Sequence, residues 1–332
     1  MTEDCPIVQL ALKLAPQHST QYAEMTARLA QPELVASPLG PFLSSLRSAR
    51  LGGHEYLLAE LADGAPLHVV DRLAATSECF EHHDEVGGVP GPFLRPLGSG
   101  HTPFVPKELA EARRYRGKTS EVFTRVLLNL ALFASERALD ARLRVLDPLA
   151  GGGTTLFAAL ALGHDVAGIE QTRKDVETTA AFLKEYCREA RIPHREERIA
   201  KGPRRFTFEL GDRADPRMLV LAEGDTRKAD EVLRTIPGGA RFDLVVGDLP
   251  YGIQHDGSAR DLLAEACPAW SRVLAPGGVL AVSWDATRLP RATIVATVAE
   301  HFDVIDRPPY DDLAHRVDRV IKRRDVVVAR KG

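Results

Sequence analysis

A run of glycines between an apolar stretch and a predicted helix is the first feature that suggests ligand binding. The segment 147–155 reads DPLAGGGTT; it follows the apolar run 144–150 and precedes a predicted helix that ends near Gly163. Glycine lets the backbone approach a ligand closely and adopts turn conformations that a Cβ atom forbids. The pattern predicts a ligand-binding turn, and a tight turn that binds nothing is the alternative.

The residues around this loop distinguish three classes of ligand. No lysine follows the glycines, which argues against a nucleoside triphosphate loop. Gly151 and Gly153 fit the first two positions of the dinucleotide pattern, but Leu156 occupies the third. S-adenosylmethionine (SAM) has no pyrophosphate and needs a close backbone approach and an acid for its ribose. Glu170, at the end of the next predicted strand, is such an acid, so we predict SAM as the cofactor.

A second signature, FDLVVGDLPYG at 242–252, has a polar residue and an aromatic residue after an apolar strand. Open α/β sheets bind ligands at the carboxyl ends of their strands. There Asp248 can accept a hydrogen bond from an amino group, and Pro250 stiffens the turn and orients the neighbouring carbonyl. Tyr251 offers a flat face on which a base can stack.

These groups suit the methylation of an aryl amine. Such an amine is a poor nucleophile because its lone pair is delocalised into the ring. If Asp248 and the carbonyl of Leu249 accepted its two protons, electron density would build on nitrogen before methyl transfer. This chemistry requires neither a covalent intermediate nor a metal. An ordinary loop with a packed Tyr251 is the alternative interpretation.

The apolar pattern around both signatures predicts a parallel α/β sheet. Short apolar runs alternate with helical stretches, at 144–150, 166–170, 218–225, 242–250 and 279–285. Two strand-like runs at 301–310 and 323–332 have no long helix between them, which favours a terminal antiparallel pair. Ser120 is a possible N-cap for an amphipathic helix that includes Phe123.

The first third of the chain is less regular. The stretch 95–107 is rich in Pro and Gly, so we predict a linker that separates an N-terminal α+β region, 1–105, from a catalytic domain, 106–332. Helical spacing is present at 18–36, whereas 55–61 and 67–75 fit either short strands or short helices. His82 and His83 lie among acids, and a solvated turn is favoured there over a metal site.

Composition sets the broad class. The 332 residues are 44% hydrophobic and 27% charged, as in ordinary globular proteins. No apolar window is long enough for a membrane span, and the N-terminus does not resemble a signal peptide. Four scattered cysteines argue against a zinc site or a disulfide framework, so we expect a cytoplasmic protein without metal. A net charge of −3 excludes a globally basic nucleic-acid binder.

Taken together, the motifs DPLAGGGTT, GDLPYG and GKTSEVFTRVLLNLA resemble those of the THUMP-type tRNA guanosine methyltransferases, over about residues 112–332. That family makes N2-methylguanosine or dimethylguanosine in tRNA with SAM as methyl donor. The resemblance implies a Rossmann-like, mostly parallel seven-stranded sheet that ends in an antiparallel strand. It also implies nucleic acid, with tRNA first, as the partner.

The resemblance assigns roles to individual residues. Phe123 and Thr124 match the motif that holds the methionine end of the cofactor, and Asp225 matches the acid near the adenine amino group. The other matching cofactor residues lie in the glycine loop and at the ribose acid, namely Asp147, Gly151, Gly153, Thr154 and Glu170; the catalytic residues are Asp248, Leu249, Pro250 and Tyr251. The sequence departs from the family at Ala150-Gly-Gly-Gly, and the first hundred residues show no THUMP pattern.

Basic residues suggest where a nucleic acid would bind. The segments 188–205 and 112–118 and the C-terminal residues Arg316, Arg319, Lys322, Arg323 and Arg324 could contact phosphates, although charge runs are more often solvated faces. Trp284 could pack on a base or belong to the core. Three other functions stay open: a DNA amino-methyltransferase, which usually carries Asn or Ser at the position of Asp248, a small-molecule amine methyltransferase, and a non-catalytic binding protein.

Overall fold

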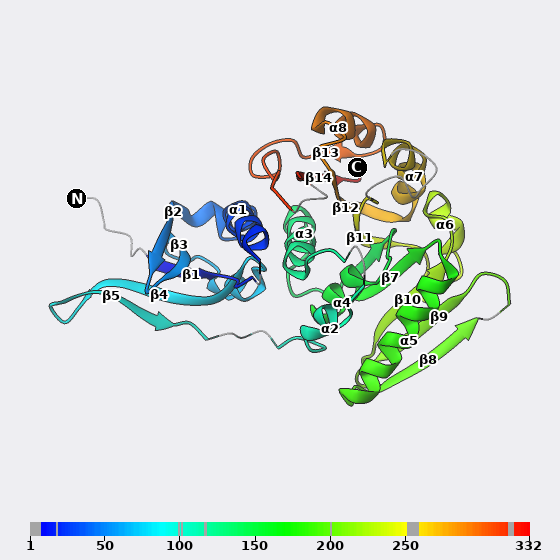
Figure 1. The fold of residues 1–332 in the computed structure, drawn as a ribbon, viewed down its shortest axis with the longest axis horizontal. Helices are drawn as coiled ribbons and strands as arrows, with labels where there is room; N and C mark the ends of the chain where they lie inside the picture. The colour runs from blue at the N-terminus through cyan, green and yellow to red at the C-terminus, as the bar shows by residue number, and fades with distance from the viewer. Residues whose placement is uncertain are drawn as a thin grey trace.

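The chain forms two β-sheets, and two helices lie between them in the sequence, as Figure 1 shows for a computed structural model. The structure describes residues 8–17, 19–98, 100, 102–115, 118–199, 201–250, 259–317 and 322–332. The first sheet is antiparallel and lies within residues 8–96, and the second is mixed and lies within residues 144–330. The division at residues 105/106 stays a prediction.

The first sheet has five strands in the order β2-β3-β1-β4-β5, paired antiparallel throughout. Helix α1 (Thr20–Ala36) lies against one face of it, and two short 3-10 helices, η1 (Gly40–Phe42) and η2 (Leu67–Arg72), connect its strands. The strand bounds are β1 (Val8–Leu14), β2 (Leu43–Leu51), β3 (His54–Leu61), β4 (Thr76–Val86) and β5 (Val89–Pro96).

These assignments settle the open expectations for the first third of the chain. The predicted helix at 18–36 is confirmed as α1, and 55–61 is a strand, whereas 67–72 is a 3-10 helix. The solvated turn predicted at His82 and His83 is wrong, because both lie within β4. His82 is buried and its Nδ1 lies 3.1 Å from Oε1 of Gln9 on the neighbouring strand. Cross-strand pairing of polar side chains explains why this charged segment is a strand.

The second sheet has nine strands in the order β13-β14-β12-β11-β6-β7-β10-β9-β8. The five central strands, from β12 to β10, pair in parallel, and both edges pair antiparallel. The strand bounds are β6 (Arg144–Asp147), β7 (Asp165–Glu170), β8 (His194–Ile199), β9 (Arg205–Leu210), β10 (Arg217–Glu223), β11 (Phe242–Asp248), β12 (Leu274–Asp285), β13 (Asp303–Val304) and β14 (Arg324–Arg330).

The Rossmann-like arrangement and its terminal antiparallel strand are therefore confirmed, but the strand count of seven is too low. The two additional strands, β8 and β9, form an antiparallel hairpin at one edge. Strand β8 lies in the basic segment 188–205, and β9 begins at the last residue of that segment. In β9, Phe206 and Phe208 are buried, whereas β8 has no fully buried residue; such an edge strand gives a weak apolar signal in the sequence.

Helices cover both faces of the second sheet. One face packs against α3 (Glu121–Ala134), α4 (Thr154–Ala161) and α5 (Arg173–Glu189), and the short helix α2 (Glu108–Ala112) lies beside α4. The other face packs against α6 (Ala229–Val232), which continues the 3-10 helix η3 (Thr226–Lys228), and against α7 (Ala259–Val273) and α8 (Arg291–Ala299). Both faces of the central strands are buried in this way, which explains their uninterrupted apolar runs.

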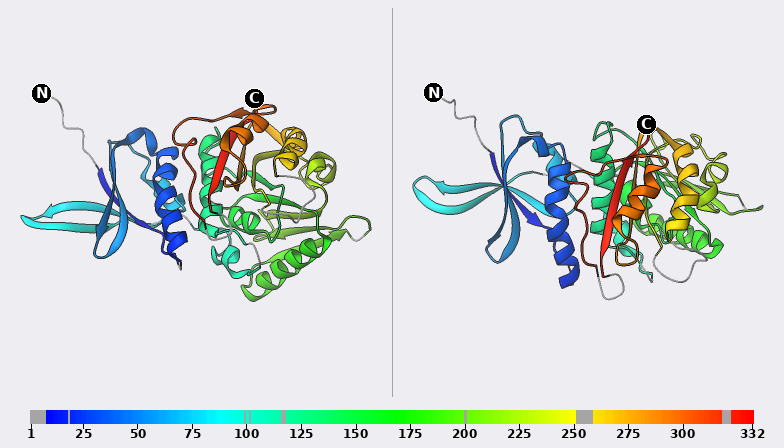
Figure 2. Two further views of the ribbon diagram at one scale, coloured as in Figure 1. Left: turned by 45° about the horizontal axis from the view of Figure 1, so that its top comes forward. Right: turned by 90° about the horizontal axis from the view of Figure 1, so that it is seen from above.

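Helix α1 connects the two sheets by packing against α3, and Figure 2 shows it between them from two directions. A polar contact fixes this junction. The buried carboxylate of Glu33 on α1 accepts hydrogen bonds from the backbone amides of Ala74 and Ala75 and from the side chain of Asn129 on α3. Burial raises the pKa of Glu33, while these donors oppose the increase.

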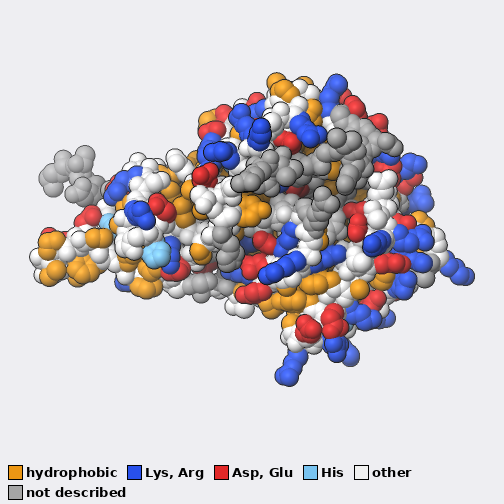
Figure 3. Space-filling model, in the orientation of Figure 1, with side chains coloured by type: hydrophobic (Ala, Val, Ile, Leu, Met, Phe, Trp, Pro, Cys, Tyr) orange, Lys and Arg blue, Asp and Glu red, His pale blue; other side chains and the backbone are white. Residues whose placement is uncertain are grey.

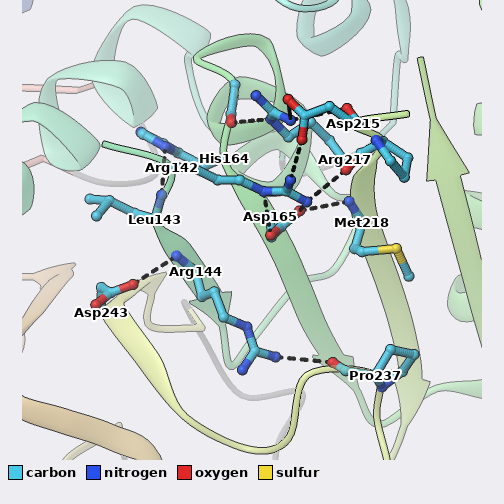
Figure 4. A network of polar contacts seen from close by, with 12 residues as sticks. Arg142, Leu143, Arg144, His164, Asp165, Asp215, Arg217, Met218, Pro237 and Asp243 are labelled. Atoms are coloured by element: carbon cyan, nitrogen blue, oxygen red, sulfur yellow. Dashed lines mark hydrogen bonds and ion pairs between the residues drawn. The ribbon is translucent and has the colours of Figure 1, made fainter. Parts of the chain in front are cut away.

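The amino ends of the central strands are held by a polar network, drawn in Figure 4. Arg142 forms a two-pronged contact with Asp165 at the start of β7, and the same carboxylate accepts the amide of Met218 at the start of β10. The amide of Arg144 donates to Asp243 on the neighbouring β11. Charged groups at this end of the sheet thus serve to fix the ends of the strands.

No described helix has the length and apolarity that crossing a bilayer requires.

Candidate active site

A cavity of about 1370 Å³ lies at the carboxyl ends of β6, β7, β11 and β12. Nearly all the predicted site residues line it: Phe123, Thr124, Asp147, Gly151, Thr154, Glu170, Asp225, Asp248, Leu249 and Pro250. Gly153 lies within the same loop but is not among the lining residues, and Tyr251 falls outside the described residues. The structure brings together two signatures separated by about a hundred residues in the chain, while the roles of their residues stay predictions.

The glycine loop has the backbone conformation that its sequence requires. Gly151 and Gly153 have φ angles of +46° and +85°, a region that favours glycine. Gly153 is the N-cap of α4, and a Cβ atom there would lie 3.1 Å from the methyl group of Thr179. The loop therefore directs the amino end of α4, with its unsatisfied backbone amides, toward the cavity.

Asp147 ends β6 and is 3% exposed. Its Oδ1 accepts the backbone amide of Leu149 at 3.0 Å, and the side chain of Thr155 is a second hydrogen-bond partner. Burial raises the pKa of Asp147 to about 7, with smaller upward contributions from the charges of Asp248 and Glu170. Asp147 therefore caps a loop amide, and it also lines the cavity.

Glu170 ends β7, and its two carboxylate oxygens are held by backbone amides. Oε2 accepts from Gly151 at 3.1 Å and Oε1 accepts from Thr172 at 2.7 Å. Its neighbour in the β7–β10 ladder is Glu223, which instead pairs with Arg173 and is not part of the cavity wall. The glycine loop and the acid are thereby fixed to one another, as a ribose-binding acid beside such a loop requires.

Asp225 follows β10, the strand that pairs with β7, and its carboxylate is occupied by local contacts. It is the N-cap of η3, where it accepts the backbone amide of Arg227, and it also pairs with the Arg227 guanidinium at 2.8 Å. This pairing lowers the pKa of Asp225. Glu265 on α7 contacts the same guanidinium.

Helix α3 places two predicted cofactor residues at the cavity. Ser120 is its N-cap and accepts the amide of Phe123, which confirms the predicted helix start. Phe123 is almost fully buried, and the Thr124 hydroxyl donates to the carbonyl of Ser120. The cap therefore sets the direction in which the first turn of α3 enters the cavity.

Asp248 ends β11 and is surrounded by donors from three other segments. Thr119 donates to Oδ2 at 2.7 Å, Ser283 on β12 donates to Oδ1, and Nη2 of Arg324 on β14 lies 3.4 Å from Oδ2. The next residue, Leu249, is buried and its amide donates to the carbonyl of Ser283 at 2.9 Å. The catalytic motif therefore begins from a rigid, hydrogen-bonded position.

Several residues around the cavity escaped the sequence prediction. Thr119, Ser283 and Tyr115 line it or contact its acids; the Tyr115 hydroxyl lies 2.7 Å from that of Thr154, and a Cβ atom on Gly152 would collide with the Tyr115 ring. Arg113 donates to the carbonyl of Gly152 at 2.6 Å. Arg113 and Tyr115 thus lie against the glycine loop, whereas we had considered their segment only as a phosphate-binding stretch.

One prediction about a basic residue is corrected, and the core alternative for Trp284 is confirmed. Arg324, assigned to a possible phosphate-binding tail, has a side chain that is only 4% exposed; Arg319 lies outside the described residues. Trp284 is fully buried and its indole donates to the carbonyl of Leu289, so it belongs to the core. Both side chains originate in the sheet, and burial in the sheet decided their contacts.

The basic segment 188–205 also carries compensating acids. Arg198 and Arg204 both contact Glu177 on α5, and Lys184 pairs with Glu196. Over this part of the surface, Figure 3 shows Lys and Arg side chains interspersed with Asp and Glu. The interpretation as a solvated, ion-paired face is therefore favoured over a phosphate-binding one. Among the described residues, no group of three or more His, Cys, Asp or Glu side chains is arranged to hold a metal ion.

Comparison with known proteins gives structural matches only. No protein-family model matches the chain, and no curated protein matches its sequence. TrmN from Thermus thermophilus is 20% identical with a TM-score of 0.43, over 86% of this chain and 59% of that one. RsmC of T. thermophilus, a 16S rRNA N2 G1207 methyltransferase in complex with AdoMet and guanosine, is 17% identical with a TM-score of 0.40, over 88% and 59%.

A methyltransferase from Pyrococcus furiosus is 15% identical with a TM-score of 0.42, over 66% of this chain and 88% of that one. The chain spans 59% of the length of the TrmN and RsmC chains that it matches.

Proposed function

We propose that this chain is a SAM-dependent N-methyltransferase that acts on an exocyclic amino group of a nucleobase. The observation that carries the proposal is that one cavity contains both the glycine loop with Glu170 and the carboxylate of Asp248. A site that only bound a cofactor would not need the carboxylate of Asp248. A site for ordinary acid or base catalysis would not need the glycine loop with Glu170.

The glycine loop, Asp147 and Glu170 form the cofactor half of the cavity, and these residues fit SAM. Gly151 and Gly153 adopt positive φ angles that bring the backbone to the cavity, and Glu170 is held against that loop by the amide of Gly151. The carboxylate of Glu170 suits two ribose hydroxyls, and the carboxyl of Asp147 suits an ammonium group. A volume of about 1370 Å³ exceeds what one drug-sized ligand fills and leaves room for an acceptor base. When bound, SAM supplies an electrophilic methyl group on sulfonium.

Asp248, Leu249 and Pro250 form the acceptor half of the cavity, and they supply the chemistry that activates the amine. Asp248 accepts one N–H of the amine and the carbonyl of Leu249 accepts the other, which orients the nitrogen lone pair toward the cofactor half of the cavity. Pro250 fixes the direction of that carbonyl. In this mechanism Asp248 also takes up the proton that the amine loses after methylation.

Guanine N2 in tRNA is the acceptor that we place first, because GDLPYG and the segment before α3 resemble the tRNA guanosine methyltransferases. Asp rather than Asn or Ser at position 248 favours this acceptor over adenine N6 or cytosine N4 in DNA. The ion-paired face around β8 and β9 supplies no support for phosphate contacts, so the surface that would bind tRNA is not assigned.

The test is a tritiated-methyl transfer assay with the purified chain on total tRNA and on genomic DNA from a host that lacks this gene, followed by nucleoside mass spectrometry. We expect label in N2-methylguanosine of tRNA. Label in methyladenine or methylcytosine of DNA would replace the tRNA assignment with the DNA one. If SAM binds but neither nucleic acid is labelled, the nucleobase proposal in this form is wrong and small amines become the substrates to screen.

A further inference from the structure

The side chain of Arg324 lies beneath the candidate catalytic carboxylate rather than on a surface. Arg324 is the first residue of β14 and faces Asp285 in the antiparallel ladder with β12. Its Nη2 atom lies 3.4 Å from Oδ2 of Asp248, and only 4% of the Arg324 side chain is exposed, against 18% for Asp248. The cation is therefore on the protein side of the carboxylate, and the carboxylate is the group nearer the cavity.

Aromatic packing holds the guanidinium in this position. Its central carbon lies 4.6 Å from the centroid of the Phe123 ring, within the range of a cation–π contact. The backbone of Arg324 also exchanges two hydrogen bonds with His315, each 2.9 Å long. The His315 ring packs against the same Phe123 at 5.0 Å. Two aromatic rings and a backbone bridge thus restrict where the Arg324 side chain can point.

The charge at this point comes from Arg324 and not from its histidine neighbour. Burial lowers the pKa of His315 to about 4, and the positive charge of Arg324 contributes to this decrease. His315 is therefore neutral at physiological pH, and its Nδ1 lies 2.9 Å from the carbonyl of Leu313. Asp248 accordingly contacts the guanidinium of Arg324 and the hydroxyl groups of Thr119 and Ser283.

We propose that Arg324 is a positioning residue for Asp248, which holds the carboxylate in one rotamer as the acceptor of the substrate amine. The inference rests on the catalytic role given to Asp248 in the proposed function. Thr119 and Ser283 fix the two oxygens by direct hydrogen bonds, and Arg324 supplies the charge that an anion at the base of the cavity requires. None of the three needs to contact the substrate.

This role predicts a specific pattern for substitutions. Arg324→Met keeps apolar bulk against Phe123 but removes the cation, so Asp248 loses both charge compensation and a fixed orientation. We expect kcat for methyl transfer to fall on the order of a hundredfold, because small displacements of a reacting group have effects of that size. The dissociation constant for SAM should change less than about threefold, since Arg324 is not part of the cavity wall.

Arg324→Lys is the conservative variant. Lysine keeps the charge and can still lie on an aromatic face, but it lacks the planar fork of the guanidinium. We expect kcat of Arg324→Lys to be about tenfold higher than kcat of Arg324→Met, while KM stays the same in both variants. The matched control is Arg330→Met at the other end of β14, where the arginine pairs with Glu136 away from the cavity. This control should keep the kcat of the unmodified chain.

A double-mutant cycle with Asp248→Asn separates positioning from damage to the fold. With tritiated SAM and total tRNA as the assay, adding Arg324→Met to Asp248→Asn should cost less than about threefold further, because the group that Arg324 positions has been replaced. If the second substitution lowers the residual rate as much as it lowers the rate of the unmodified chain, Arg324 acts on the fold alone and the proposal is overturned.

The same four proteins are compared by urea unfolding, which requires no substrate. We expect Arg324→Met to lower the urea midpoint in the unmodified chain and to lower it by less than half as much beside Asp248→Asn. Additive midpoint shifts would overturn the proposed pairing. Failure of the proposed function looks different: Asp248→Asn would then transfer methyl groups at the full rate, whatever Arg324→Met does.

Discussion

Two acids end neighbouring parallel strands at the same cavity, yet the protein surrounds them differently. Asp147, on β6, is held by the amide of Leu149 and the hydroxyl of Thr155, both neutral donors. Asp248, on β11, has a guanidinium from Arg324 in addition to its two hydroxyl donors. One half of the cavity thus places a carboxyl group among neutral donors, and the other half provides its own cation.

One cavity can in this way hold two acids for different tasks. Burial raises the pKa of Asp147, so this carboxyl group gains most from a ligand that brings a positive charge, as the ammonium and sulfonium groups of SAM do. The carboxylate of Asp248 is instead oriented by a cation and two hydroxyl groups of the protein, which leaves it placed to accept hydrogen bonds from a neutral amine. This division of tasks can be tested at each acid.

The largest effect is expected at the acceptor half. Asp248→Ala should lower the rate of methyl transfer by about 10²–10⁴-fold, the range that one positioned acid or base contributes. The dissociation constant for SAM, measured by calorimetry, should stay within about threefold because the cofactor half is intact. Unchanged turnover would show that Asp248 has no part in catalysis, and an equal loss of SAM affinity would show that the two halves are not separate.

At the cofactor half, Glu170→Ala should weaken SAM binding by about 10–100-fold, since a charged hydrogen-bonding group contributes roughly 1.5–3 kcal/mol. Glu223→Ala is the matched control, because Glu223 faces Glu170 in the β7–β10 ladder but is not part of the cavity wall. Calorimetric titration of both variants tests the assignment. Equal affinities for the two variants would remove the ribose role from Glu170.

The raised pKa of Asp147, about 7, makes cofactor affinity depend on pH. If the ionised carboxyl binds the ammonium of SAM, affinity should increase by about tenfold from pH 5.5 to pH 7, as Asp147 loses its proton. Asp147→Asn should bind SAM more weakly at pH 7 and show a flat dependence over this interval. Fluorescence titration at several pH values measures both curves, and parallel slopes for the two proteins would exclude Asp147 as the titrating group.

The smallest effect concerns stability without cofactor. Because the folded-state pKa of Asp147 is raised, its contribution to stability is fully present below the ordinary value of 3.8 and is lost as the pH rises through about 7. Asparagine carries no charge at any pH, so Asp147→Asn should raise Tm by about 2–4 °C at pH 8 and by less than half as much at pH 5. Scanning calorimetry at the two pH values is the measurement, and the same gain at both would contradict the argument.

Much of the fold and the cavity wall was predictable because the signals are local. Ser120 as the cap of α3, the glycines with positive φ and the five central strands each depend on residues close in sequence. The regions that were predicted wrongly lack such signals. Strand β8 and the strand around His82 carry charged residues in place of an alternating apolar pattern, and pairing with neighbouring strands stabilises them.

The sequence by itself determined which residues can do chemistry at this site: a glycine loop, a strand-end glutamate and an aspartate followed by a leucine and a proline. Only the tertiary structure decided how each charge is compensated. Arg324 was one of several basic residues near the C-terminus, and its place beneath Asp248 follows from the pairing of β14 with β12 and the packing of α3. The physical reason is that the energy of a charge depends on burial and on neighbours in space, which residue spacing along the chain does not specify.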